Sequence, residues 1–115
     1  MSTIATALIQ MRSGIDPAVN LAMACDLIRQ AAARGATLIA TPETTHLVQK
    51  DAGHAFAVMR SPDEDPAIPA FAALAKDLGV TLLIGSLAVK LADRRAANRS
   101  FLFAPDGRLL ASYDK

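Results

Sequence analysis

The chain has 115 residues, of which 52% are hydrophobic and 20% charged, and its formal net charge is +1. These values fit one globular domain or part of one. The balance of 12 basic and 11 acidic residues gives no electrostatic reason to expect nucleic acid or an anionic membrane as a partner. A single cysteine, Cys25, excludes an internal disulfide and a multi-cysteine zinc site.

The first third of the chain alternates apolar runs with one helix. The uncharged, β-branched run at 3–10 predicts a strand buried on both faces. Asp16 and Pro17 are placed to begin a helix, and Gly35 follows its end. The apolar run at 37–42 predicts a second buried strand. A buried stripe on the helix is expected from residues at three- and four-residue steps: Leu21, Cys25, Ile28 and Ala32.

The middle of the chain predicts a loop and a second helix. Residues 44–65 carry few periodic signals and are expected to form a loop. Pro69 is placed to open the helix, and Gly79 to end it. Its apolar face is expected from Phe71, Leu74, Ala75 and Leu78.

The last third predicts three strands. Residues 80–89 form an apolar run, and a polar turn is expected around Asp93. The runs at 98–105 and 108–115 flank Asp106-Gly107, which predicts a hairpin. The order is therefore β-α-β-α-β followed by an antiparallel pair, and it predicts an α/β layer with parallel strands joined by right-handed crossovers.

Glu43 comes directly after the second predicted strand, in the stretch GATLIATPETTHLVQK. Functional groups of open α/β sheets gather just beyond the carboxyl ends of the strands. Pro42 has no N–H, so it ends the strand pairing and stiffens the backbone before Glu43. Partial desolvation at such a point raises a carboxyl pKa toward values that suit proton transfer. The plainer interpretation is a surface glutamate that ends a strand or caps a turn.

Three segments resemble, in order, the N-terminal part of the nitrilase or carbon–nitrogen hydrolase superfamily, and most closely its Nit-type amidase branch. They are ALIQM with NLAMACDLIRQAAARGATLIATPE, then FAALAKDLGVTLLIGSLAV, then ANRSFLFAPDGRLLASYDK. The resemblance spans nearly the whole chain. It implies half of an α-β-β-α sandwich, with parallel βαβαβ followed by an antiparallel hairpin.

The resemblance also implies a reaction, the hydrolysis of a small-molecule amide through a cysteine thioester with release of ammonia and a carboxylic acid. Glu43 would be the general base and acid, and Lys115 would stabilise the oxyanion. Thr44 and His46 are candidates for substrate binding. The resemblance implies no metal and no organic cofactor. It implies a homo-oligomer for the intact protein.

The nucleophilic cysteine of the family follows its lysine by a few dozen residues. Residues 1–115 are therefore expected to be the N-terminal part of a carbon–nitrogen hydrolase domain, truncated after the lysine strand. Cys25 is expected to be a small buried residue of the first helix, unable to replace the nucleophile. The 115-residue chain by itself is expected to be inactive.

Other residues have weaker signals. His46 and His54 find no third ligand of suitable spacing for a metal, so both are interpreted as loop histidines. The pair Lys50-Asp51 is a candidate contact for a substrate carboxylate. Asn98 is expected to tie neighbouring backbone together, and Gly85 to be a close-packing or β-bulge position in a strand.

Two other functions fit the same elements. One is a small α/β module that binds a nucleotide or flavin, although no G-x-G-x-x-G pattern follows the first strand. The other is a non-catalytic remnant that serves as an assembly surface. The opening residues lack a signal-peptide pattern and no uncharged run is long enough to cross a bilayer, which predicts a cytoplasmic protein.

Overall fold

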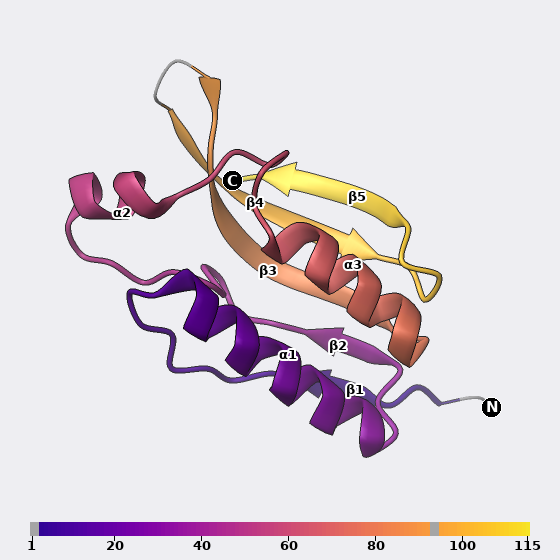
Figure 1. Ribbon diagram of the computed structural model, residues 1–115. Coiled ribbons are helices and arrows are strands. Elements are labelled where there is room, and N and C mark those ends of the chain that lie inside the picture. The colour runs from indigo at the N-terminus through magenta and orange to yellow at the C-terminus, as the bar shows by residue number, and fades with distance from the viewer. Residues whose placement is uncertain (1–2, 93–94) are drawn as a thin grey trace.

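The chain folds into a five-stranded sheet, and its two long helices pack against one face of that sheet (Figure 1). It is described by a computed structural model for residues 3–92 and 95–115. The strand order follows the chain. β1 (Thr6–Leu8), β2 (Leu38–Ala40) and β3 (Thr81–Lys90) are parallel, and β4 (Ala96–Phe103) and β5 (Leu109–Asp114) continue the sheet antiparallel. The predicted α/β order is confirmed, whereas the turn expected around Asp93 lies outside the described residues.

Helix α1 (Pro17–Ala33) begins where the sequence predicts. The Asp16 side chain accepts hydrogen bonds from the N–H groups of Ala18 and Val19, which satisfies donors that have no partner within the helix. The buried stripe is displaced by one residue from the predicted one. Ile28 is buried as expected, but the other fully buried positions are Asn20 and Ala24, and Leu21 and Cys25 are only half-buried.

Two helices lie between β2 and β3. Helix α2 (Ala52–Val58) was not predicted, because it is short and buries only Ala55, so it has almost no apolar period. The expectation of a loop over all of 44–65 is therefore wrong. Helix α3 (Ala67–Leu78) begins two residues before Pro69 and ends at Gly79, whose φ of 64° is left-handed. Its predicted apolar face is confirmed at Phe71, Leu74 and Ala75.

The core lies between β3 and the two long helices. Its largest fully buried side chains include Ile28 from α1, Phe71 from α3, and Leu82 and Ile84 from β3. The Phe101 ring of β4 stacks on that of Phe103, with ring centroids 6.1 Å apart. Each fully buried large apolar side chain contributes about 1.5–3 kcal/mol. This packing joins β3 and β4 to the two long helices in one core.

The opposite face of the sheet is uncovered, and it is called the open face below. Its side chains alternate along the strands with the buried ones and include Leu8, Leu83 and Tyr113, which are 80%, 38% and 69% exposed. The prediction of a first strand buried on both faces is wrong. β1 has only three residues and lies at the sheet edge, and the helices cover one face alone.

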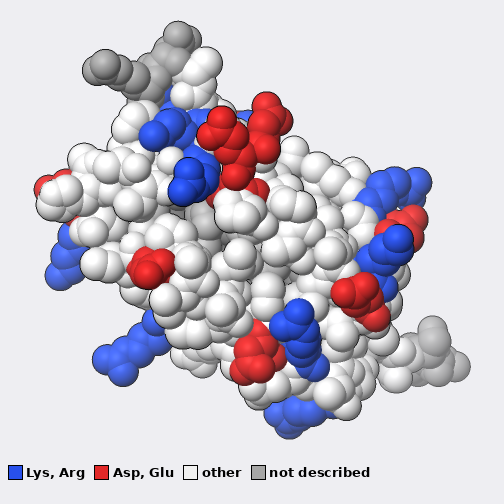
Figure 2. Space-filling model, in the orientation of Figure 1, with Lys and Arg blue, Asp and Glu red and all other residues white. Residues whose placement is uncertain are grey.

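Charged side chains of both signs are interspersed over the surface shown in Figure 2, as the near-neutral net charge suggests. Arg99 and Asp114 form a bidentate ion pair between β4 and β5. Arg99 Nε donates to Asp114 Oδ1 at 2.6 Å, and Arg99 Nη2 donates to Asp114 Oδ2 at 3.0 Å. The hydrogen bond from Arg99 lowers the pKa of the exposed Asp114 carboxyl.

Among the described residues, no helix is long and apolar enough to span a membrane.

Candidate active site

Glu43 lies in a tight turn, Thr41–His46, at the carboxyl end of β2. Thr41 donates its N–H to Leu83 O at 2.9 Å, and Pro42 then ends the strand pairing because it has no N–H to donate. Thr44 has a φ of +47°, which is uncommon for a β-branched residue and reverses the chain. Such a conformation persists only where the surroundings hold it.

β3 supplies those surroundings. Thr44 donates its N–H to Ser86 Oγ at 2.8 Å, and Thr45 donates its N–H to Ser86 O at 2.9 Å. Ser86 is fully buried beneath the turn. One residue of β3 therefore binds two consecutive N–H groups of the turn that carries Glu43.

A β-bulge at Gly85 makes this close approach possible. The register of β3 on β4 shifts between Ile84 and Leu87, so Gly85 and Ser86 together face Ser100. A Cβ on Gly85 would overlap the carbonyl groups of Thr41 and Pro42. The prediction of a close-packing or bulge position at Gly85 is confirmed.

Buried hydroxyl groups fix the turn internally. Thr45 Oγ1 donates to Pro42 O at 2.6 Å, so its single proton is committed. Thr41 Oγ1, 2.8 Å from Thr45 Oγ1, must then be the donor between the two hydroxyls, and it accepts from Gly85 N–H at 3.1 Å. The result is a directed chain of hydrogen bonds from β3, through Thr41 and Thr45, back to the residue before Glu43.

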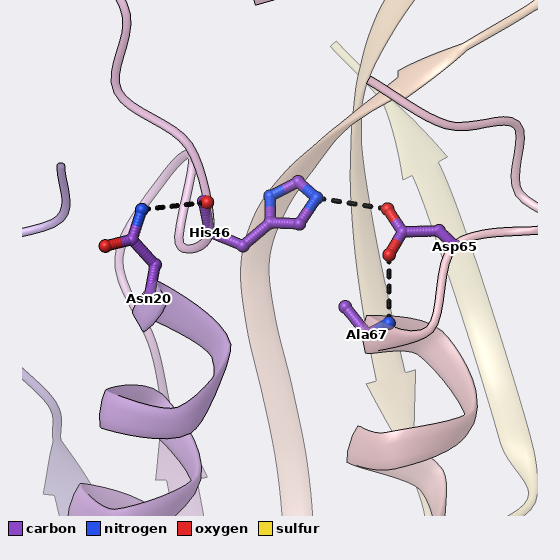
Figure 3. Close-up of polar contacts among 4 residues, drawn as sticks. All are labelled: Asn20, His46, Asp65 and Ala67. Atoms are coloured by element: carbon purple, nitrogen blue, oxygen red, sulfur yellow. Dashed lines mark hydrogen bonds and ion pairs between the residues drawn. The ribbon is translucent and has the colours of Figure 1, made fainter. Parts of the chain in front are cut away.

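His46 is anchored at the other end of the turn (Figure 3). Its Nε2 lies 3.0 Å from Asp65 Oδ2, and its carbonyl oxygen accepts from Asn20 Nδ2 at 2.9 Å. Asp65 Oδ1 accepts the N–H of Ala67 at 2.9 Å, which caps the start of α3. His46 and Asp65 are both 4% exposed, so His46 is a buried residue and not a surface loop histidine.

The Asp65 carboxyl is shifted by this environment. Burial acts to raise its pKa, but the hydrogen bonds from His46 and from the Ala67 N–H, together with the charges of His46 and Arg60, lower the pKa below its ordinary value. Asp65 is therefore ionised at neutral pH, and both of its oxygens are acceptors.

Acid should weaken the fold through Asp65. Because its folded pKa lies below the ordinary value of about 3.9, the ionised form stabilises the fold fully above that value, and this stabilisation is lost as the pH falls through the folded pKa. Urea unfolding of the wild type and of Asp65→Asn checks this. Their difference in free energy of unfolding should be constant above about pH 5 and shrink below about pH 4. A difference that stays constant across the acid range would contradict the prediction.

Lys115 follows β5 and donates its N–H to Asn98 O at 2.9 Å. β5 is antiparallel to β4 and so runs in the direction of β2 and β3, as the arrows in Figure 1 show. The carboxyl ends of β2 and β5 therefore lie at the same end of the sheet. Asn98 accepts the bond from Lys115 through its backbone carbonyl oxygen, as any strand residue can, so the bond does not test the structural role predicted for Asn98.

Lys115 lies on the open face, because the register continues it opposite Asn98, on the same face as Tyr113. The Thr41–Pro42 backbone, which leads to Glu43, lies against Gly85 of β3. β2 and β5 are three strand spacings apart, about 14 Å at the backbone.

The Glu43 side chain is exposed, and it makes no hydrogen bond with any residue that the structure describes. The partial desolvation expected for it is therefore not found among the described residues. Lys115 is likewise exposed.

The other predicted residues have separate roles. Thr44 is half-buried and uses its hydroxyl to donate to Glu43 O at 2.8 Å. Asp51 caps α2 by accepting the N–H of His54 at 2.8 Å, so its carboxylate is engaged in a structural contact. Among the described residues, no three side chains are grouped as metal ligands.

Cys25 is half-buried on α1 and packs against the core that the helices cover. Burial raises the pKa of the Cys25 thiol, and the nearby Arg29 opposes this in part. A raised pKa disfavours the thiolate that a nucleophile requires.

Sequence reasoning did not identify Asn20, Thr41, Asp65 or Ser86 as parts of the site. Asp65 does carry a local signal, since it precedes Pro66 at the start of a helix, where an acidic residue often caps. Ser86 carries none, because its partners in the turn are 41 and 42 positions away.

Comparison with known proteins gives a consistent match. Residues 5–115 match the sequence model of the family described as carbon–nitrogen hydrolase. The omega-amidase NIT2 of Mus musculus is 31% identical over 120 residues, and that of Homo sapiens is 29% identical. Each alignment covers all of this chain and 41% of the relative, so the chain spans about two fifths of the length of these relatives.

Solved structures agree in fold. An amidase from Nesterenkonia sp. superposes with a TM-score of 0.82 at 27% identity, over 97% of this chain and 42% of that one. A mutant of that bacterial amidase was solved in complex with butyramide. A carbon–nitrogen hydrolase from Helicobacter pylori G27, 20% identical, superposes with a TM-score of 0.82 over 97% of this chain and 39% of that one, and it supports the fold alone.

Proposed function

Because the chain belongs to the carbon–nitrogen hydrolase family, we propose that it supplies the acid–base and oxyanion-binding part of an active site that hydrolyses small amides. The observation that carries the proposal is the clamped turn of Glu43 at the carboxyl end of β2, which lies at the same end of the sheet as Lys115. The similarity to proteins described as omega-amidases and amidases supports an amide as the substrate class.

In the proposed reaction, a cysteine from polypeptide outside these 115 residues attacks the amide carbon. Glu43 takes the thiol proton and passes it to the departing nitrogen, so that ammonia leaves and a thioester remains. Glu43 then takes a proton from water, and the hydroxide attacks the thioester. The carboxylic acid leaves, and the proton returns to the thiolate. One solved relative is described with acrylamide added at its active-site cysteine, which supports a cysteine nucleophile.

Lys115 has the electrostatic role in this proposal. Its ammonium group is aimed at the oxygen of the tetrahedral intermediate, where negative charge develops. Such a charge acts most strongly where water is excluded. In this chain Lys115 is exposed. The proposal therefore includes further polypeptide that covers the open face and excludes water from the site.

The 115-residue chain alone should not hydrolyse amides. Its single cysteine, Cys25, is on the covered face, so no nucleophile reaches a substrate held near Glu43. Release of ammonia from butyramide by the pure chain measures this directly. The matched sample is a longer polypeptide that carries this chain together with a later cysteine, and it should release ammonia. Turnover by the pure 115-residue chain, or none by the longer polypeptide with any small aliphatic amide, would contradict the proposal.

We also propose that the complete protein forms a homo-oligomer, as the resemblance implies. Its native mass, measured by light scattering, tests this independently of activity.

A further inference from the structure

Three segments that are distant in sequence meet at His46. Asn20 of α1 accepts the N–H of Gly14 at 2.9 Å and donates to both Gly14 O and His46 O, at 2.8 and 2.9 Å. The His46 ring pairs with Asp65, which also caps α3. The last residue of the Glu43 turn is thus tied to the starts of both long helices (Figure 3).

The hydrogen bonds define the tautomer of His46. Asp65 is ionised and can only accept, so the proton between the two residues belongs to His46 Nε2. His46 Nδ1 is buried and has no partner among the residues that the structure describes. The structure therefore favours the Nε2–H form.

The position of Glu43 depends on its backbone. No described residue bonds to its carboxylate, so the anchors of the turn fix the direction of its Cα–Cβ bond, from which the carboxylate extends. Ser86 anchors the middle of the turn and His46 its downstream end. Thr44, between Glu43 and His46, has the strained φ of +47° and would relax if one anchor were lost.

We propose that Asp65 is a positioning residue, which fixes Glu43 by holding the His46 ring. The inference rests on the proposed function, in which Glu43 is the acid–base group. A cavity of about 590 Å³ borders His46 and Asp65, so a ring released from Asp65 has room to rotate away. The segment between Glu43 and His46 would then move with the ring, and the Glu43 carboxylate would no longer be held in position for proton transfer. A misplaced base transfers protons poorly, because it must be within hydrogen-bond reach of its substrate.

The substitution Asp65→Asn tests this with little change of shape. The amide oxygen can still accept the Ala67 N–H and cap α3, but the amide group then presents a donor toward the Nε2–H of His46. Asp16→Asn is the matched control. It also changes a helix-capping aspartate to a residue that caps well, and its side chain bonds only to the start of α1.

Hydrogen exchange on the 115-residue chain is the first readout. In Asp65→Asn, the amides of Thr44 and Thr45 should exchange about tenfold faster or more, while the amide of Leu82, fully buried in β3, should be unchanged. The ¹⁵N shifts of the His46 ring should report loss of the Nε2–H form. Asp16→Asn should change none of these. Equal acceleration at Leu82 would mean global destabilisation and would overturn the proposal, as would unchanged exchange at Thr44 and Thr45.

Kinetics of the longer polypeptide give the second readout. Asp65→Asn should lower kcat for butyramide about tenfold while KM changes less than about twofold, since a base is misplaced and binding is retained. Glu43→Gln is measured beside it. If Glu43→Gln keeps full activity, the proposed function fails. If Glu43→Gln is inactive and Asp65→Asn keeps the wild-type kcat, the positioning role alone is wrong.

Discussion

Replacing Glu43 with glutamine should lower kcat for a small amide by about 10²–10⁴-fold, the usual contribution of a general acid–base group. Glutamine has the shape of glutamate but cannot take the proton of the thiol or of water. The measurement is ammonia release by the longer polypeptide that carries the chain. The fold should not change, because the Glu43 side chain is exposed and bonds to no described residue. The free energy of unfolding should therefore stay within about 0.5 kcal/mol of wild type.

The only other glutamate of the chain, Glu64, provides the matched control. It is exposed in the connection before α3, and Glu64→Gln makes the same chemical change at a side chain that bonds to no described residue. Glu64→Gln should keep wild-type kcat. Equal activity of both variants would show that Glu43 has no acid–base role.

Replacing Gly85 with alanine should disrupt the turn that carries Glu43. The added methyl group would overlap the carbonyl groups of Thr41 and Pro42, which are backbone atoms and cannot rotate away. Overpacking of this kind costs about 1–3 kcal/mol, and occasionally more. The turn would have to lift from β3, so Ser86 would lose its bonds to Thr44 and Thr45.

Urea unfolding measures the cost, and the amide shifts of Thr44 and Thr45 report the displacement. Gly14→Ala is the control, because a Cβ at Gly14 has no atom within 4 Å and its φ is not in the left-handed region. It should change the free energy of unfolding by less than about 0.5 kcal/mol. If Gly85→Ala were as stable as Gly14→Ala and left the shifts unchanged, the described contact between β3 and the turn would be wrong.

These expectations explain the form of the motif around Glu43. Pro42 ends strand pairing, Gly85 admits the backbone that crosses above it, and Ser86 captures the N–H groups that the turn exposes. The carboxylate itself is left free of structural contacts. A carboxylate without such contacts can exchange protons with a substrate. The residues around the turn, and not the carboxylate itself, hold the backbone of Glu43 in place.

The amino-acid pattern was sufficient for the elements with strong local signals. Asp16 with Pro17 located the start of α1, and Asp106-Gly107 located the hairpin of β4 and β5. The amino-acid pattern did not predict a short helix with one buried position, and it did not show which face of an apolar strand is exposed. α2 has seven residues with one buried position, and the apolar run at 3–10 resembles a central strand although β1 is an edge strand with Leu8 exposed.

The sequence by itself determined the α/β order, the placement of Glu43 beyond a strand, and the resemblance to carbon–nitrogen hydrolases, because these depend on neighbouring residues and periodicity. Only the tertiary structure showed which residues hold Glu43. Ser86 reaches the turn through a bulge, and Asp65 reaches it through His46, 19 positions earlier. Hydrogen bonds between side chains and distant backbone depend on how strands and helices pack, and no local pattern in the chain specifies that packing.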